Sequence, residues 1–239
     1  MKFENTYVGN IEGAIRGMRN PLASWDKSDS HYETLESYIN HAKKDENIIP
    51  KYIIGEKDMD LAQRLIKAGP EHRKFLRQIF VSVDITAPIY WWKEMSTYKV
   101  ATVANSTSTM HKIASTPITI DCFETGDFEK DLEYYCGNTI EMFSDLIIEQ
   151  LEFLRKKYDE TKDIKYWKEL IRWLPESWLQ KRTWSANYET LYSIILQRGR
   201  HKLETEWGKG FIHWCTTLPY AKELLFLGEA RESFFDLYK

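Results

Sequence analysis

TAPIYWWKEMSTYKVATVANSTSTMH, residues 86–111, joins aromatic and hydroxyl side chains more densely than any other part of the chain. It follows an apolar run, residues 79–85, that alternates like a strand, with Val81, Val83 and Ile85 on one face. The Pro-led aromatic segment predicts a short helix, and the Ser/Thr/Asn-rich end predicts a loop. Such runs are most often plain surface loops, although their hydroxyl, amide and backbone N–H groups can also hold a phosphate or a pyrimidine edge.

The overall composition is that of a soluble globular protein without an excess of positive charge. The 239 residues include 33 Lys and Arg against 36 Asp and Glu, a net charge of −3, so duplex nucleic acid is not expected as a partner. No run approaches the ~20 apolar residues of a membrane helix, and the N-terminal segment has no apolar signal core. The three cysteines fit no zinc spacing and are typical of reduced thiols. We therefore expect a cytoplasmic protein that does not enter a membrane.

Hydrophobic periodicity predicts an α+β chain, organised as one domain over residues 1–239. Asp58 stands in a capping position of one helix, and Gly69 ends that helix. The polar segment 22–56 leaves a helix over residues 32–43 as one interpretation. Strands are expected at residues 3–8 and 79–85, and helices at residues 11–18, 58–67, 71–78, 128–158, 165–173, 187–197, 203–215 and 220–227.

The longest predicted helix, residues 128–158, carries one apolar stripe. Its members recur at spacings of three and four residues, which places them on one face. They are Cys136, Ile140, Phe143, Ile147, Leu151, Leu154 and Tyr158. Such a stripe indicates a core or a subunit interface rather than a cofactor site.

Most familiar chemical signatures are missing from the sequence. The six histidines show no HxH or HExxH spacing, so no metal site is predicted, and no Rossmann, P-loop or nucleophile-elbow motif occurs. Glu71 and His72 are interpreted as charges on a helix surface. Two candidates remain, the loop of residues 105–109 and Arg198, because a guanidinium suits a bidentate phosphate contact. Taken alone, Arg198 is more often a surface arginine.

Two separate blocks of sequence resemble the flavin-dependent thymidylate synthases. In that family a segment API[FY]-x-x-RQ-x-x-RHR-x-A-S precedes an N-E-x-S loop. Here residues 87–90 read APIY, Lys93-Glu94 stand in the RQ position, residues 97–99 (TYK) occupy the RHR slot and residues 105–108 (NSTS) resemble the loop. The second block, LP…W…N-x-R-x-L…R, is matched by Leu174-Pro175, Trp184, Asn187, Leu191 and Arg198.

This resemblance implies a fold, an activity and a set of ligands. The fold would be that of the family, a small mixed or antiparallel sheet with a bundle of long helices, assembled as a homotetramer. The activity would be reductive methylation of dUMP or a related pyrimidine nucleotide, with FAD as cofactor and with NADPH and methylenetetrahydrofolate as co-substrates. The implied substrate-binding residues are Lys93, Glu94, Asn105, Ser106, Thr107, Ser108, Arg172 and Arg198. The implied cofactor-binding residues are Thr97, Tyr98, Lys99, Asn187, Glu189 and Ser193. No enzymic nucleophile is implied, so the catalytic residue stays open.

Several departures from the family pattern remove positive charge. The RHR slot keeps one cation, at Lys99, and Met110 replaces an arginine after the NSTS segment. Glu189 reverses the charge of a family arginine, and we expect it to repel a flavin phosphate. Because each lost charge-assisted contact is worth ~1.5–3 kcal/mol, a second interpretation is a non-catalytic nucleotide-binding or interaction module that kept the fold. A third is a helical scaffold with an unrelated function.

Overall fold

The computed structural model describes residues 1–33 and 51–239. The helix considered for residues 32–43 lies largely outside these ranges, so that interpretation stays a prediction. None of the helices in the described ranges combines the length and apolar character needed to span a bilayer.

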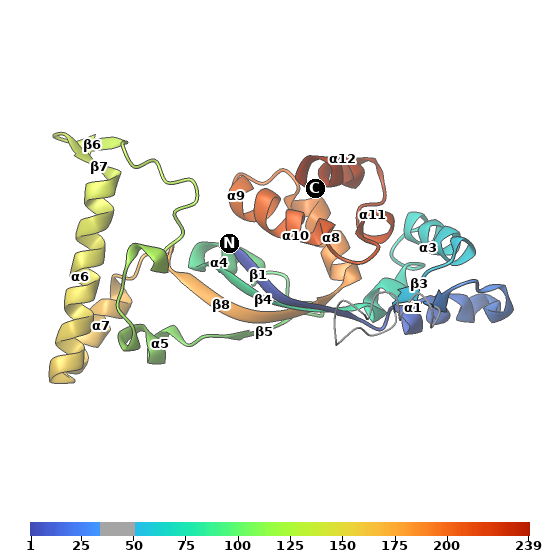
Figure 1. The fold of residues 1–239 in the computed structure, drawn as a ribbon, viewed down its shortest axis with the longest axis horizontal. Coiled ribbons are helices and arrows are strands. Elements are labelled where there is room, and N and C mark those ends of the chain that lie inside the picture. Colours follow the sequence, from blue (N-terminus) through green and yellow to red (C-terminus); the bar gives the residue numbers. More distant parts are fainter. Residues whose placement is uncertain (34–50) are drawn as a thin grey trace. The chain divides into compact units, whose positions relative to one another are not determined.

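A four-stranded sheet connects distant parts of the sequence. Its strand order is β1 (Lys2–Gly9), β4 (Phe80–Pro88), β8 (Leu179–Asn187) and β5 (Val103–Ser106) (Figure 1). In β4, Val81, Val83, Ile85 and Ala87 are buried. The alternation predicted for this strand is therefore confirmed. The α+β class and the small sheet are confirmed as well.

Short antiparallel pairs and many helices complete the chain. The pairs join β2 (His31–Tyr32) to β3 (Tyr52–Ile53) and β6 (Glu133–Tyr135) to β7 (Asn138–Thr139). The α-helices are α1 (Ile11–Arg19), α3 (Glu56–Ala68), α4 (Ile89–Met95), α5 (Thr109–Lys112), α6 (Ile140–Thr161), α7 (Ile164–Arg172), α8 (Tyr188–Arg198), α9 (Glu204–Glu206), α10 (His213–Thr216), α11 (Ala221–Leu224) and α12 (Glu229–Tyr238). The 3-10 helices are η1 (Asn20–Leu22), η2 (Trp25–Lys27), η3 (Lys74–Gln78), η4 (Ile113–Ser115) and η5 (Ile120–Cys122), and η6 (Trp207–Ile212) is a π-helix.

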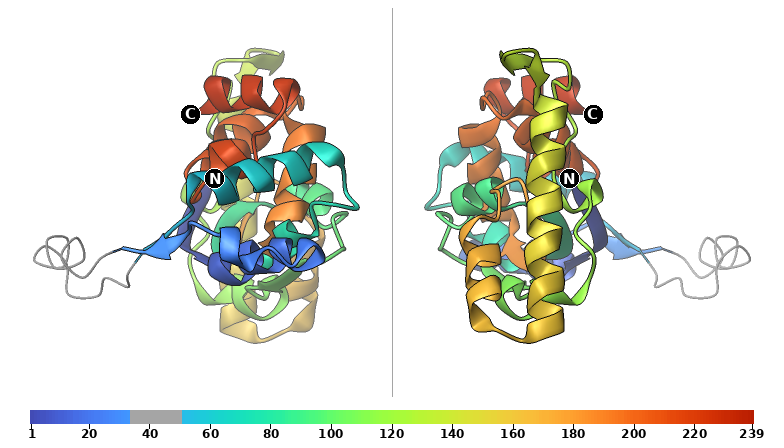
Figure 2. Two further views of the ribbon diagram at one scale, coloured as in Figure 1. Left: turned by 90° about the vertical axis from the view of Figure 1, so that its right-hand side faces the viewer. Right: turned by 90° about the vertical axis from the view of Figure 1, so that its left-hand side faces the viewer.

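The chain divides into two compact units, each with its own core. Unit 1 comprises Met1–Asn5, Val83–Lys99 and Val103–Trp184, and unit 2 comprises Thr6–Ser82, Val100–Thr102 and Ser185–Lys239. The prediction of a single domain stays a prediction. In unit 1, α6 and α7 lie side by side (Figures 1 and 2). Their core residues are Ile113, Ile118, Phe123, Leu151 and Leu170. Buried aromatic residues of unit 2 include Tyr188, Trp207, Phe211 and Phe226.

The longest helix begins later than the sequence predicts. The helix α6 starts at Ile140, not at residue 128, because Gly137 turns the β6–β7 pair with a φ of +76° and Thr139 caps the helix. The Oγ1 atom of Thr139 accepts a hydrogen bond from the backbone N–H of Met142 at 3.4 Å. Cys136 is therefore not part of the apolar stripe, and its side chain is exposed.

Three other elements differ from the sequence prediction. Strand β8 lies where no element was predicted, because only Trp184, Ala186 and Asn187 of its nine residues are buried and the apolar pattern is faint. Residues 71–78 form turns and η3 rather than a regular helix. Asp58 lies inside α3 rather than at its cap. The capping function belongs to Asp29, whose carboxylate accepts the backbone N–H groups of Lys57 and Asp58 at 2.9 and 3.1 Å.

The carboxylate of Glu152 connects α6 to the segment before it. Arg155 donates to its two oxygens from Nε and Nη2, both at 2.7 Å, and the Ile118 backbone N–H donates at 2.9 Å. The Arg155 hydrogen bonds, helped by that of Ile118, lower the pKa of Glu152 from 4.5 to about 2.

This lowered pKa predicts an acid-sensitive contribution to stability. A carboxylate with a depressed folded-state pKa contributes fully above about pH 4.5, and the contribution is lost as the pH falls towards about 2. We expect Glu152→Gln to lower the free energy of unfolding by about 1–2 kcal/mol near neutral pH. Urea unfolding of both proteins from pH 7 down to pH 2.5 checks this, since the difference should shrink across that window. A difference independent of pH would contradict the assignment.

Candidate functional site

The NSTS segment, predicted as a loop, is largely an edge strand. Asn105 and Ser106 end β5, whose neighbour in the sheet is β8. The next residue, Thr107, continues this pairing, because its N–H donates to the carbonyl of Lys181 at 2.9 Å. Ser108 instead caps α5, with its Oγ accepting the His111 N–H at 3.2 Å. The side chains of Asn105, Ser106 and Thr107 are exposed, so their polar groups can contact a ligand.

The helix α4 and the residues after it carry the first predicted block. Lys93 is exposed and pairs with Glu176. The Thr97 hydroxyl donates to the carbonyl of Glu94 at 2.7 Å, which closes the end of the helix. Tyr98 is half-buried and Lys99 is exposed. The RHR slot thus presents one cation, one aromatic ring and a hydroxyl that is already bonded.

A second cation stands beside this slot, supplied by β8. The guanidinium of Arg182 lies over the Trp92 ring, 4.4 Å from its centroid, and Nη1 donates to Ser96 Oγ at 3.5 Å. Its Nε donates to Gln180 Oε1 at 3.0 Å. Burial lowers the pKa of Arg182, although an arginine stays charged. Sequence reasoning missed Arg182 because it did not predict β8. The one hint of this cation in the sequence is a basic residue shortly before a tryptophan in a polar segment.

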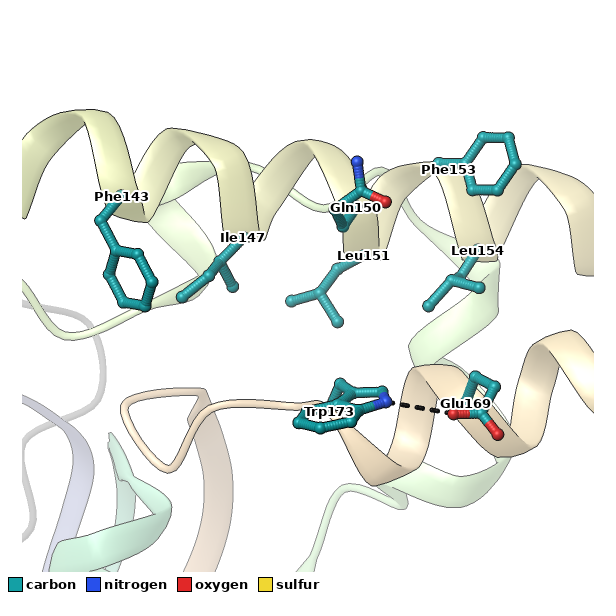
Figure 3. A pocket seen from close by; sticks show the side chains of 8 residues that line it. All are labelled: Phe143, Ile147, Gln150, Leu151, Phe153, Leu154, Glu169 and Trp173. Carbon is teal, nitrogen blue, oxygen red and sulfur yellow. Dashed lines mark hydrogen bonds between the residues drawn. The ribbon is translucent and has the colours of Figure 1, made fainter. Parts of the chain in front are cut away.

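Arg172, at the end of α7, is exposed and pairs with Glu169 one turn earlier. The groove between α7 and α6 is apolar (Figure 3). It has a volume of about 520 Å³, and the side chains of Phe143, Ile147, Leu151 and Leu154 point across it towards Trp173. The Trp173 Nε1–H donates to Glu169 at 3.1 Å. With few polar atoms and no cation in its lining, the groove suits an apolar partner better than a nucleotide phosphate.

The helix α8 carries the second predicted block. Asn187 is its buried N-cap, and its Oδ1 accepts the Thr190 N–H at 3.0 Å. Ser193 is half-buried one turn further along. Arg198 lies in the last turn, and its guanidinium packs over the Trp207 ring at 4.8 Å from the centroid.

Glu189 does not present a bare negative charge, contrary to the expectation from the sequence. Arg73 Nε donates to both Glu189 carboxylate oxygens, at 2.9 and 3.1 Å. Each side chain is only 16% exposed, so the two charges compensate each other in a mostly dry setting. Sequence reasoning missed Arg73 because it lies 116 residues away in the chain, and no local motif marks it.

A second cavity, in unit 2, contains residues that the sequence analysis placed on a helix surface. It has a volume of about 530 Å³ and is enclosed by the end of α1, by α3 and by η3. Glu71, His72 and Lys74 line it, together with Asn20 and Gln78. Glu71 and His72 are therefore cavity residues. Within residues 1–33 and 51–239, no three His, Cys, Asp or Glu side chains gather as metal ligands.

The two blocks of the sequence resemblance meet in space. In unit 1, the N–H groups of Ile89 and Tyr90 donate to the carbonyls of Trp178 and Glu176, both at 3.1 Å. In unit 2, the Thr190 hydroxyl donates to the carbonyl of Val100 at 3.4 Å. The NSTS segment belongs to unit 1 and Arg198 to unit 2, so a cavity shared by these two stays a prediction.

Solved structures of the same architecture identify the fold. A flavin-dependent thymidylate synthase from Helicobacter pylori, ThyX, complexed with FAD and dUMP, is 16% identical, with a TM-score of 0.62 over 95% of this chain and 98% of that one. A second structure of the Helicobacter pylori enzyme with FAD and dUMP is also 16% identical, with a TM-score of 0.64 over 98% and 99% of the two chains. The chain has the fold of the flavin-dependent thymidylate synthases.

The flavin-dependent thymidylate synthase fold extends over nearly the whole chain, so the predicted resemblance is confirmed at the level of the fold. A UMP/dUMP methylase from Streptomyces cacaoi, PolB, bound with 5-Br dUMP, shares it with 13% identity and a TM-score of 0.54 over 96% of each chain. No family model matches the sequence, and no curated protein sequence matches it significantly. The roles of the individual predicted residues in this fold stay predictions.

Proposed function

We propose that this protein is a flavin-dependent methyltransferase acting on a pyrimidine nucleotide. It binds FAD and reductively methylates dUMP or a related nucleotide, with methylenetetrahydrofolate as one-carbon donor and NADPH as reductant. The observation that carries the proposal is a shared fold over 95–99% of both chains with enzyme structures that contain FAD and dUMP. The retained positions of Asn187 and Arg198 at the two ends of α8 support it.

The residues present fit a flavin dinucleotide better than the sequence alone suggests. The ion pair with Arg73 removes the repulsion expected from Glu189. In unit 1, Arg182 adds a cation beside the slot that holds Tyr98 and Lys99. When bound, reduced FAD supplies a hydride to the pyrimidine. Lys99 contributes charge for a phosphate, and Tyr98 offers a ring for stacking. Thr97, Asn187, Glu189 and Ser193 complete the proposed flavin contacts.

The proposed substrate contacts come from the β5 edge and from scattered charges. The exposed polar groups of Asn105, Ser106 and Thr107 bind the pyrimidine and sugar, while the Arg198 guanidinium holds the phosphate. Lys93, Glu94, Ser108 and Arg172 are the remaining proposed contacts. The residues orient the nucleotide, and none of them is assigned as a nucleophile.

The proposed homotetramer finds support on the exposed side of α6. Met142, Leu146 and Phe153 are each about half exposed, an unusual amount of apolar surface for a solvent-facing helix. Size-exclusion chromatography with light scattering is expected to give four times the chain mass of 28.4 kDa. Leu146→Asp should shift the protein to smaller species, whereas Lys156→Asp, at an exposed site on the same helix, should not.

The absorption spectrum of freshly purified protein tests the proposed function. We expect the two visible bands of bound flavin, or their appearance after added FAD and gel filtration. With flavin loaded, dUMP and methylenetetrahydrofolate should trigger NADPH oxidation and release of a methylated nucleotide, measured by mass spectrometry. A colourless protein that takes up no added FAD would contradict the proposal.

A non-catalytic nucleotide-binding module is the second candidate. One observation favours it: the RHR slot has Lys99 as its single cation, and its Thr97 hydroxyl is engaged by the carbonyl of Glu94. The same assay separates the candidates. A module would bind dUMP in a titration, yet would neither retain flavin nor form a methylated product.

A further inference from the structure

Two arginines from distant parts of unit 2 converge on one tyrosine. Arg73 lies just before η3 and Arg231 lies in α12, which packs beside α8 (Figure 1). Their guanidinium carbons lie over the Tyr192 ring, 4.5 Å and 3.5 Å from its centroid. Glu189 and Tyr192 are three residues apart on α8, so both side chains lie on the same helix face. The cluster of Arg73, Glu189, Tyr192 and Arg231 is therefore one local structure.

Each of the two guanidinium groups is hydrogen-bonded through a single nitrogen of its own. Arg73 is anchored through Nε by the Glu189 carboxylate, and Arg231 through Nε by the backbone carbonyl of Tyr192 at 3.1 Å. Among the described residues, no acceptor bonds to Nη1 or Nη2 of either arginine. None of these nitrogens is buried without a partner, so solvent can reach them. Each guanidinium group thus keeps Nη1 and Nη2 as donors that no acceptor of the described residues engages.

The charges of the cluster do not balance. Two guanidinium groups face a single carboxylate, that of Glu189, and burial already lowers the pKa of Arg231. A net positive charge in a partly buried setting favours binding of an anion. A guanidinium holds a phosphate with two parallel N–H bonds. Both guanidinium carbons lie within 4.5 Å of one ring centroid, so each group can take one of two linked phosphates.

We propose that Arg73 and Arg231 form a binding site for a diphosphate group, with Glu189 as the positioning residue of Arg73 and Tyr192 as the support of both side chains. The choice of a diphosphate as ligand rests on the N–H donors of Arg73 and Arg231. Identification of the ligand as a dinucleotide rests on the proposed function. Glu189 then has a role opposite to the repulsion expected from sequence, since it fixes the cation that meets the ligand.

Calorimetric titration of the full chain with inorganic pyrophosphate tests the site. We expect the dissociation constant to rise at least tenfold in Arg73→Gln and in Arg231→Gln. Arg64→Gln is the matched control, because Arg64 is an exposed arginine of the same unit paired with Asp60. Arg231→Lys keeps the charge and most of the packing but loses the planar fork, so it should weaken binding even where the glutamine variant folds poorly.

Parallel titrations with FAD separate this inference from the proposed function. If pyrophosphate does not bind the wild type, or binds the arginine variants as tightly as the wild type, the site is refuted. If FAD binds and both variants keep wild-type affinity for it and for pyrophosphate, the site fails while the proposed function stands. If pyrophosphate binding depends on both arginines but the wild type binds no FAD, the site stands and the flavin assignment fails.

Discussion

Replacing Asp58 with alanine is expected to lower the free energy of unfolding by about 3–5 kcal/mol. Asp58 is fully buried within α3 and receives Arg19 Nε at 2.5 Å, while the Arg19 side chain is itself only 5% exposed. The hydroxyls of Ser28 and Ser30 donate to its second oxygen at 2.6 and 2.5 Å. Removal of the carboxylate leaves the buried Arg19 guanidinium without a counter-charge, and an uncompensated buried charge strongly destabilises the folded state.

The matched control for Asp58 lies two residues further along the same helix. Asp60 pairs with Arg64, and both side chains are two-thirds exposed, so solvent screens the pair and Asp60→Ala should change stability little. Chemical denaturation of the three proteins at neutral pH measures the effect. Equal, small changes in Asp58→Ala and Asp60→Ala would show that the Arg19–Asp58 pair does not hold α1 to α3.

The Asp58 effect should also depend on pH. Burial raises the pKa of Asp58, but hydrogen bonds from Ser28, Ser30 and Arg19 outweigh it and hold the pKa below its ordinary value of 3.8. A carboxyl with a depressed folded-state pKa stabilises the protein above its unfolded pKa and loses this contribution as the pH falls through the folded one. The difference between wild type and Asp58→Ala should therefore narrow below about pH 4.

Patterns confined to one element were readable from the sequence. The alternation of β4 appears directly in residues 79–85, and Asn187 is a residue type that favours a helix N-cap. The alternation was predicted, since it depends on neighbours within a few positions. Asn187 was predicted as the first residue of a helix, and it is the N-cap of α8 instead. The start of α6 was missed for a local reason too, because the stripe continues in register through Cys136 while Gly137 allows the turn that breaks it.

Contacts between residues that are far apart in the chain could not be predicted from the sequence, and these contacts matter most at the candidate site. A charge reversal at Glu189 looks harmful in the sequence, but the fold brings Arg73 to it from 116 residues away. Arg182 could not be placed beside Ser96 because β8, a polar strand whose neighbours in the sheet are β4 and β5, has too few buried residues to show a strand pattern. The sequence motif shows that a family cation is missing at a position, but only the fold shows that Arg73 and Arg182 bring other cations close to the motif residues.

Replacing Arg198 with alanine is expected to raise the dissociation constant for dUMP by about 10- to 100-fold, the value of one charge-assisted bidentate contact. Arg198 closes α8 and packs on Trp207, so part of any loss could come from the fold of unit 2. Arg198→Lys addresses this, because it keeps the charge and the aliphatic stem while removing the planar fork. Calorimetric titrations of both variants with dUMP, at equal thermal stability, measure the contact.

Arg200 supplies the control for Arg198, since it is an exposed arginine two residues beyond it. Arg200→Ala removes the same charge from nearly the same place, so a general electrostatic attraction would weaken dUMP binding equally in both alanine variants. If the contact is directed at the phosphate, only Arg198→Ala weakens dUMP binding, and 2′-deoxyuridine, which lacks the phosphate, should bind wild type and Arg198→Ala alike. Unchanged dUMP affinity in Arg198→Ala would remove the phosphate assignment of Arg198.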